Sequence, residues 1–115
     1  MKTEVPSEAF ECELFAGWLE ERGYLFSHLS QNTFTRSWAV KAKLKRAGVR
    51  KGVPDYIICL KNKPRLCFIE MKRVKGGKQS PDQVRWIKAI NQTGNVARVC
   101  EGFSQACEAV CAAEK

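Results

Sequence analysis

The sequence predicts an α/β domain with a central mixed β-sheet of about four strands flanked by helices. Helical and strand patterns alternate along 115 residues, a length ordinary for one compact domain, so residues 1–115 are expected to form a single domain. Two short apolar runs, 52–60 and 65–72, are separated by a polar break with Asn62 and Pro64, as is typical of a β-hairpin with a loop of about four residues. Both runs lack polar alternation, which indicates strands covered on both faces.

The hairpin register brings charged residues together. If Leu60 pairs with Arg65, counting outward in antiparallel register sets Asp55 directly opposite Glu70, on the same face of the sheet. Lys72 lies two residues beyond Glu70 and therefore joins that face. Two carboxylates and an ammonium thus converge at one end of a hairpin whose remaining positions are expected to be core: Ile57, Ile58, Phe68 and Ile69.

Two interpretations of this charged group stay open at this point. Burying acids is costly without a compensating cation, so the first is a structural salt bridge of the acids to Lys72. The second is a hard-metal site, because Mg²⁺ takes oxygen ligands from one or two carboxylates and completes its shell with waters and substrate phosphates.

The motifs carry a family resemblance. Pro54-Asp55 followed by Glu70-x-Lys72 resembles the Pro-Asp…Glu-x-Lys signature of the PD-(D/E)XK nuclease superfamily. Three blocks together resemble the virus-type replication-repair nuclease (VRR-NUC) domain in its stand-alone, phage-like form, over about residues 7–110: Gly52-Val53-Pro54-Asp55, Phe68-Ile69-Glu70-Met71-Lys72 and Ser80-Pro81-Asp82-Gln83. This resemblance implies a restriction-endonuclease-like αβββαβ core.

The resemblance also implies an activity: metal-dependent hydrolysis of DNA phosphodiester bonds, on branched DNA such as Holliday junctions, by a homodimer. Bound Mg²⁺ or Mn²⁺ would activate a water and neutralise charge on the phosphate. The expected metal ligands are Asp55, Glu70, the backbone carbonyl of Met71 and, directly or through water, Glu8. Lys72 is expected to orient the attacking water, and the family glutamine corresponds to Gln83 and points towards the active site.

A first helix is expected to begin after Ser7 as N-cap and to stop at Gly23. Glu8 and Glu11 border its core-facing stripe. The resemblance places an acid of this helix at the metal site and favours Glu8 over Glu11. Capping and the helix dipole explain Glu8 almost as well.

Residues 24–29 are expected to form a strand that leads into a polar block, 30–33. The resemblance sets His28 and Asn32 near the substrate groove, whereas a surface histidine and a turn asparagine are the commoner meanings. A basic helix follows over about residues 37–47 and ends at Gly48. Its mixture of lysines with apolar residues suits contacts to phosphates and suits a solvated helix face equally.

Residues 73–78 are expected to be a loop without the spacing of a phosphate-binding P-loop. Ser80 then starts a helix that stops near Gly94, with Pro81 at its first position and Gln83 in a capping box. The capping role of Gln83 and its family role near the active site both remain open. A strand over 96–100 and a helix over 103–113 complete the order.

The charge distribution indicates a polyanionic partner. The net charge is +8, and residues 36–78 hold 14 Lys or Arg but only two acids, Asp55 and Glu70. A solvated basic surface is the plainer alternative. The candidate DNA-binding residues are Lys43, Lys45, Arg46, Lys51, Lys75, Lys78 and Asn32.

The remaining expectations concern compartment and rival functions. The sequence has neither a membrane-spanning run nor a signal peptide pattern, so a cytoplasmic location in a bacterial or phage-infected cell is expected. The six cysteines form no Cys-x-x-Cys pair and are interpreted as small buried hydrophobes. The rivals to a junction nuclease are a general nuclease, a non-catalytic nucleic-acid-binding module and a protein-binding subunit or anti-host factor. The intact acid pair favours an enzyme.

Overall fold

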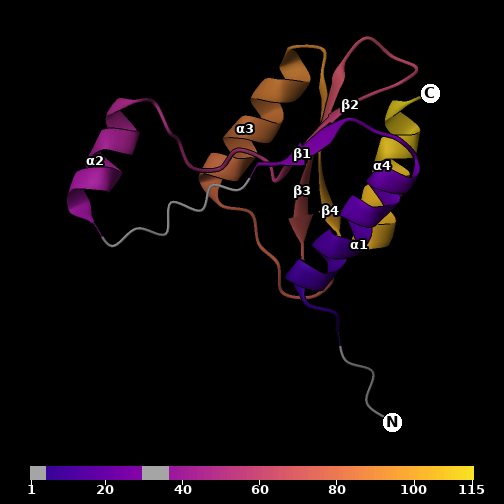
Figure 1. Cartoon of the computed structure of the whole chain (residues 1–115), viewed down its shortest axis with the longest axis horizontal. Coiled ribbons are helices and arrows are strands. Elements are labelled where there is room, and N and C mark those ends of the chain that lie inside the picture. The colour runs from indigo at the N-terminus through magenta and orange to yellow at the C-terminus, as the bar shows by residue number, and fades with distance from the viewer. Residues whose placement is uncertain (1–4, 30–36) are drawn as a thin grey trace.

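The structure is a computed structural model, and it describes residues 5–29 and 37–115. The order of helices and strands is the one that the sequence predicts (Figure 1). The elements are α1 (Glu8–Glu21), β1 (Phe26–His28), α2 (Trp38–Arg46), β2 (Tyr56–Cys59), β3 (Leu66–Lys72), α3 (Pro81–Gln92), β4 (Val96–Glu101) and α4 (Phe103–Ala113). Within the described ranges, no helix is both long enough and apolar enough to cross a membrane.

The four strands form one mixed sheet in the order β1-β2-β3-β4. β1, β2 and β3 pair antiparallel, while β3 and β4 run parallel, which confirms the predicted mixed sheet. Tyr56 pairs with Ile69, and the N–H of Leu60 donates to the carbonyl of Arg65 at the hairpin loop. This is the predicted register, and its continuation by one residue sets Asp55 opposite Glu70.

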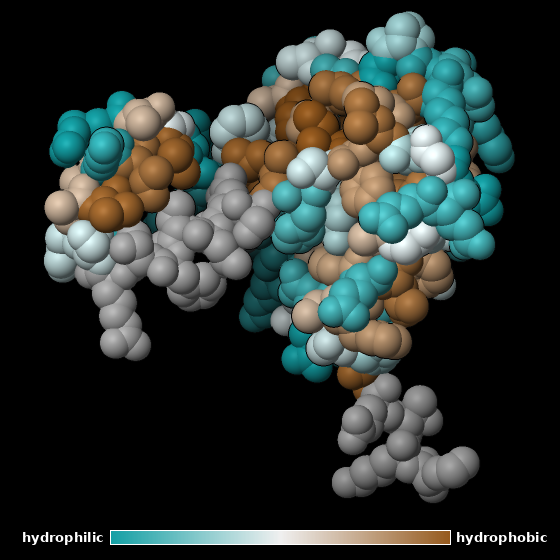
Figure 2. Space-filling model, viewed as in Figure 1, coloured by the Kyte–Doolittle hydropathy of each residue, from teal (hydrophilic) through white to brown (hydrophobic). Residues whose placement is uncertain are grey.

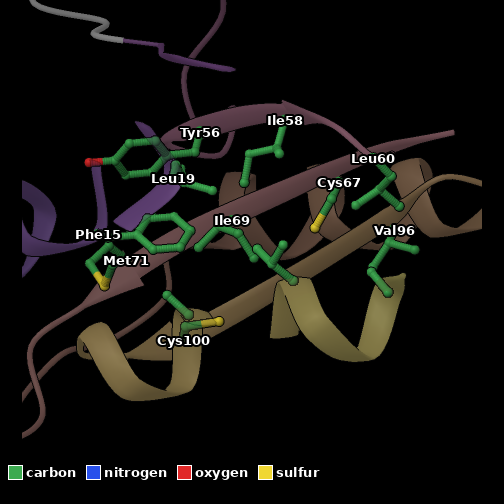
Figure 3. Close-up of a cluster of buried hydrophobic side chains, with 13 residues drawn as sticks. Phe15, Leu19, Tyr56, Ile58, Leu60, Cys67, Ile69, Met71, Val96 and Cys100 are labelled. Atoms are coloured by element: carbon green, nitrogen blue, oxygen red, sulfur yellow. The ribbon is translucent and has the colours of Figure 1, made fainter. Parts of the chain in front are cut away.

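Helices cover the two faces of the sheet unequally. α1 and α4 lie side by side on one face, and α3 lies on the other (Figure 1). The core fills the space between the sheet and the α1–α4 pair (Figure 3). It contains Phe15 and Leu19 of α1, Val110 of α4, and the inward residues of the hairpin strands, Tyr56, Ile58, Cys67, Ile69 and Met71.

The opposite face of the hairpin is less covered than the sequence predicts. Ile58 and Ile69 are fully buried, but Ile57 and Phe68 are only half-buried. α3 packs mainly on β4 and leaves this face of β2 partly open. The expectation that both faces of the hairpin are buried is therefore wrong for Ile57 and Phe68.

α2 contributes nothing to the core. Ser37 caps it by accepting the N–H of Val40, and the helix ends before Gly48 as expected, yet none of its residues is buried. Figure 1 shows α2 projecting to one side of the sheet. Trp38 is 86% exposed. This exposure is compatible with both interpretations of the basic helix, a solvated face and contact with phosphates.

The free edge of β4 is occupied by a side chain. Asn91, on α3, accepts the N–H of Ala97 through Oδ1 at 2.9 Å and donates through Nδ2 to the Ala97 carbonyl at 3.0 Å. These are the bonds that a further strand would make at this position. The amide of Asn91 thus ends the sheet at β4.

The cysteines differ from expectation in part. Cys67 and Cys100 are buried, Cys12 and Cys107 are partly buried, and all six thiols are free. Cys59 and Cys111 are exposed, so their interpretation as buried hydrophobes is wrong. Both lie on the outward side of elements whose opposite side forms the core, β2 and α4.

Candidate active site

Asp55 lies where proline interrupts the ladder between β2 and β3. The register sets Met71 opposite Pro54, whose ring nitrogen has no hydrogen to donate. Oδ2 of Asp55 instead accepts the Met71 N–H at 2.8 Å. Because the N–H and C=O of one strand residue point to the same side, the Met71 carbonyl faces the Asp55 side, where Pro54 supplies no donor. The Asp55 carboxylate and the Met71 carbonyl oxygen therefore lie close together at the open end of the hairpin.

Glu70 is the buried acid of the pair, with 3% of its surface exposed. Its Oε2 lies 3.4 Å from Nζ of Lys72 and accepts a hydrogen bond from Nε2 of Gln83 at 3.1 Å. Burial, followed by the negative charge of Asp55, raises the pKa of Glu70 to about 7, and Lys72 opposes this rise. A cation bound beside the two acids would reduce the free-energy cost of keeping Glu70 ionised.

Gln83 connects Glu70 to the start of α3. Its Oε1 accepts the Ser80 N–H at 2.9 Å while Oγ of Ser80 accepts the Gln83 N–H, which completes the predicted capping box. Its Nε2 remains for Glu70. One amide thus serves both interpretations that the sequence leaves open, because its oxygen caps the helix and its nitrogen contacts the acid.

The segment that leads to Asp55 is pressed against α3. Gly52 has φ +93, and a Cβ on it would lie 2.6 Å from the Asp82 carbonyl carbon, so only glycine fits. Nε1 of Trp86 donates to the Lys51 carbonyl at 3.0 Å. These two contacts fix the position of Asp55 relative to the helix that carries Gln83.

Glu11 has a structural partner. It is 7% exposed, and its Oε2 accepts the Phe103 N–H at 2.6 Å. Phe103 opens α4, whose N-cap is Gly102, a residue with no side chain to cap the helix. Glu11 therefore supplies the missing cap and places a negative charge at the positive end of α4.

Glu8 is exposed in the first turn of α1, one turn before Cys12. Burial raises the pKa of the Cys12 thiol, and the charges of Asp55, Glu8 and Glu70 add to the rise. Cys12 therefore lies within electrostatic reach of all three carboxylates. The sequence interpretation treats Cys12 only as a core residue, although its spacing of four from Glu8 places both on one face of the helix.

The predicted basic residues fall into two groups. Lys51, Lys75 and Lys78 are exposed on the segments that enter and leave the acid pair. The basic side chains of α2, including Lys43, Lys45 and Arg46, are exposed. α2 itself projects to one side of the sheet (Figure 1). Asn32 lies outside the described residues.

His28 lies at the end of β1, opposite Tyr56 in the register. Its side chain is exposed, and its ring meets the Tyr56 ring edge-on with centroids 4.7 Å apart. Tyr56 in turn donates its hydroxyl hydrogen to the Cys12 carbonyl. His28 is therefore on the same face of the sheet as Tyr56, with which its ring makes an edge-on contact.

The donor set fits a hard cation. Residues 5–29 and 37–115 contain no group of three or more His, Cys, Asp and Glu placed to hold a metal. Two carboxylates and a backbone carbonyl, from Asp55, Glu70 and Met71, are nevertheless sufficient for Mg²⁺, which keeps several waters. A cavity of about 340 Å³ lined in part by Arg65, Asn95 and Arg98 lies at the opposite end of β3 and β4 and takes no part in this site.

The fold is that of an α/β domain, and the family model that matches the chain is of nuclease type. The family model of the VRR-NUC domain matches residues 8–104, so the chain belongs to the VRR-NUC domain family, as its motifs predict. No curated protein matches the chain in sequence.

Solved structures agree on the fold. One, described as "VRR_NUC domain protein", has a TM-score of 0.78 and 20% sequence identity, with 96% of this chain and 90% of the other chain covered. Another, described as "VRR_NUC domain", has a TM-score of 0.62 and 21% identity, with 88% of this chain and 90% of the other covered. Both confirm the predicted mixed sheet flanked by helices.

Proposed function

We propose that this chain is a Mg²⁺- or Mn²⁺-dependent DNA endonuclease that hydrolyses phosphodiester bonds and prefers branched DNA such as Holliday junctions. The observation that carries the proposal is the acid pair Asp55 and Glu70, held at the end of the hairpin with Lys72 and Gln83 on the same carboxylate. Membership of a nuclease-type family supports the reaction class.

The acid pair favours an enzyme over a binding module. Asp55 and Glu70 are the only acids among 14 bases in residues 36–78. Glu70 is buried, and its pKa is raised to about 7, so its negative charge is unfavourable in the folded protein. A module that only binds phosphates gains nothing from this arrangement, whereas a metal site requires it.

The roles of the residues follow from their contacts. A bound metal ion would lower the pKa of a coordinated water and neutralise charge that develops on the scissile phosphate. Asp55, Glu70 and the Met71 carbonyl would hold the metal. Lys72, 3.4 Å from Glu70, would orient the attacking water and stabilise negative charge on the phosphate oxygens.

Two further residues assist the ligands. Gln83 fixes Oε2 of Glu70 by its hydrogen bond, so that the carboxylate keeps one orientation. Glu8 would reach the metal directly or through water, since Glu11 is engaged with Phe103. The exposed lysines Lys51 and Lys75 would contact phosphates on either side of the acid pair.

A homodimer would suit symmetric cutting of a junction, because each 13.0 kDa chain supplies one site. The DNA would lie across two copies of the site, with its phosphates neutralised by the basic side chains. Preference for a junction would then come from the fixed separation of the two sites.

The test incubates purified protein with labelled four-way junction, duplex and single-stranded DNA, in Mg²⁺, Mn²⁺ or EDTA. Cleavage is expected with metal only, and Asp55→Asn and Glu70→Gln are expected to abolish cleavage while binding is unchanged or tighter. Glu13→Gln, an exposed charge removal on α1, is the control and should cut normally. Near wild-type cleavage by either site variant would show that the site is wrongly assigned.

A further inference from the structure

α2 presents an aromatic side chain to solvent on a projecting helix. Trp38 is 86% exposed, the highest value among the large apolar side chains of the described residues. Val40 is 44% exposed, and none of the residues of α2 is buried. Figure 2 shows brown, hydrophobic side chains gathered on this lobe beside teal, hydrophilic ones.

A short helix with no buried residue gains little stability from the rest of the protein. Nine residues, none of them buried in the part of the chain that the structure describes, are marginal as a helix in water, and an exposed tryptophan beside a further exposed apolar side chain points to a binding surface. The helix is connected to the site through the chain that follows it. Nη1 of Arg50 donates to the Lys45 carbonyl at the end of α2, and two residues later Gly52 packs against α3. α2 is therefore an arm attached at the entrance of the Asp55 segment.

The positive charge of this arm favours a negatively charged partner. Residues 37–54 contain six Lys or Arg and no acid. Nζ of Lys41 lies 6.0 Å from the centroid of the Trp38 ring, so a cation accompanies the aromatic surface. Contact between this arm and the same arm of a second copy would bring like charges together, whereas a nucleic acid offers phosphates for the basic side chains and ring faces for the indole.

We propose that Trp38 stacks on a nucleobase at the branch point of the DNA while the lysines of α2 hold the adjoining phosphates. In a continuous duplex each base already stacks on two neighbours, whereas a branch point presents base faces without one. The indole thus contributes binding energy only at discontinuities. This inference rests on the proposed DNA substrate and names a residue that recognises its shape.

The experiment measures binding in EDTA, so that cleavage does not enter. Wild type, Trp38→Ala, Trp38→Phe and the control Leu25→Ala are titrated with a four-way junction and a duplex of equal length. Leu25 is an apolar side chain outside α2 that is 75% exposed. Both DNAs carry 2-aminopurine, and the junction carries it beside the branch point. Trp38→Ala should weaken junction binding about tenfold and change duplex binding by less than about twofold. Trp38→Phe should retain most of the affinity, and Leu25→Ala all of it.

The 2-aminopurine signal reports stacking directly. Its fluorescence should fall when wild type binds the junction and should fall much less with Trp38→Ala. Lys43→Ala, in contrast, should weaken junction and duplex equally, because phosphate contacts do not distinguish them.

The inference is overturned if Trp38→Ala leaves junction affinity unchanged or weakens both DNAs to the same extent. It is also overturned if Trp38→Ala dissociates an oligomer in sedimentation while DNA binding is unchanged, because Trp38 would then contact protein. Failure of the nuclease proposal is separate. If Trp38→Ala weakens junction binding selectively but the protein shows no metal-dependent cleavage, the role of Trp38 stands and the nuclease proposal is rejected. If the protein cleaves DNA but Trp38→Ala has no effect on junction binding, the nuclease proposal stands and the role of Trp38 is rejected.

Discussion

Replacement of Glu70 by glutamine should stabilise the metal-free protein at alkaline pH. Glutamine keeps an oxygen that can accept from Gln83 and Lys72, and it removes the buried charge. The pKa of Glu70 rises from the ordinary 4.5 to about 7 because of burial and the neighbouring charge of Asp55. Since one pKa unit corresponds to about 1.4 kcal/mol, the ionised side chain costs the folded state about 3 kcal/mol.

The sign of the pH effect follows from proton binding. Between about pH 4.5 and 7 the folded state keeps the Glu70 proton while the unfolded state releases it, so stability falls as pH rises through this window. The loss is complete about one pH unit above the folded-state pKa of about 7. The advantage of Glu70→Gln should therefore be about 1 kcal/mol at pH 5 and about 3 kcal/mol at pH 8.5.

Urea unfolding in EDTA at these two pH values measures the difference. With a slope of about 1.5 kcal/mol per molar urea, the midpoint of the variant should exceed that of wild type by about 2 M at pH 8.5. Glu13→Gln, which removes an exposed charge, should show no such pH-dependent gain. Equal midpoints of Glu70→Gln and wild type at pH 8.5 would refute the reasoning, because the carboxylate would then carry its charge without cost.

Four further outcomes are expected. Saturating Mg²⁺ at about 100 times its dissociation constant should raise the unfolding free energy of wild type at pH 8.5 by about 3 kcal/mol and leave Asp55→Asn unchanged in thermal melts. Gly52→Ala should destabilise the folded protein by several kcal/mol in urea unfolding and reduce cleavage, because the added Cβ would lie 2.6 Å from α3. Gly48 is also at positive φ but has open space around it, so Gly48→Ala should cost only about 1 to 3 kcal/mol. Equal losses of stability in the two variants would contradict the packing argument. Lys72→Ala should lose cleavage and retain Mg²⁺ affinity, and loss of Mg²⁺ binding would reject its assigned role. Lys75→Ala should reduce by about one the slope of the logarithm of the DNA association constant against the logarithm of the salt concentration. An unchanged slope would reject the phosphate contact assigned to Lys75.

The hairpin and its acid pair were predictable because their signals are local. A loop of about four residues fixes the register, and the register alone sets Asp55 against Glu70. The helix starts at Ser7 and Ser80 were equally readable, since an N-cap is a matter of three or four consecutive residues. Gln83 was placed correctly near the acid through its family motif, and its double hydrogen bonding needed the structure.

Other features depend on tertiary contacts that no local pattern encodes. Glu11 caps a helix that begins 92 residues later, and its sequence neighbourhood describes only its own helix. The lysine-rich pattern of α2 fits a surface helix and a phosphate-binding helix alike, so its projection away from the sheet was not readable. The half-exposure of Ile57 follows from where α3 packs, which an apolar run cannot indicate.

The amide of Asn91 has a consequence for the behaviour of the protein at high concentration. An open strand edge is a template on which other chains can pair and aggregate, and β4 is a strand of six residues at the margin of the sheet. By bonding both the N–H and the C=O of Ala97, Asn91 deprives an incoming chain of that pair of partners. Growth of the sheet by pairing at Ala97 would therefore require Asn91 to give up both of its hydrogen bonds, so a single amide far from the acid pair protects this part of the β4 edge.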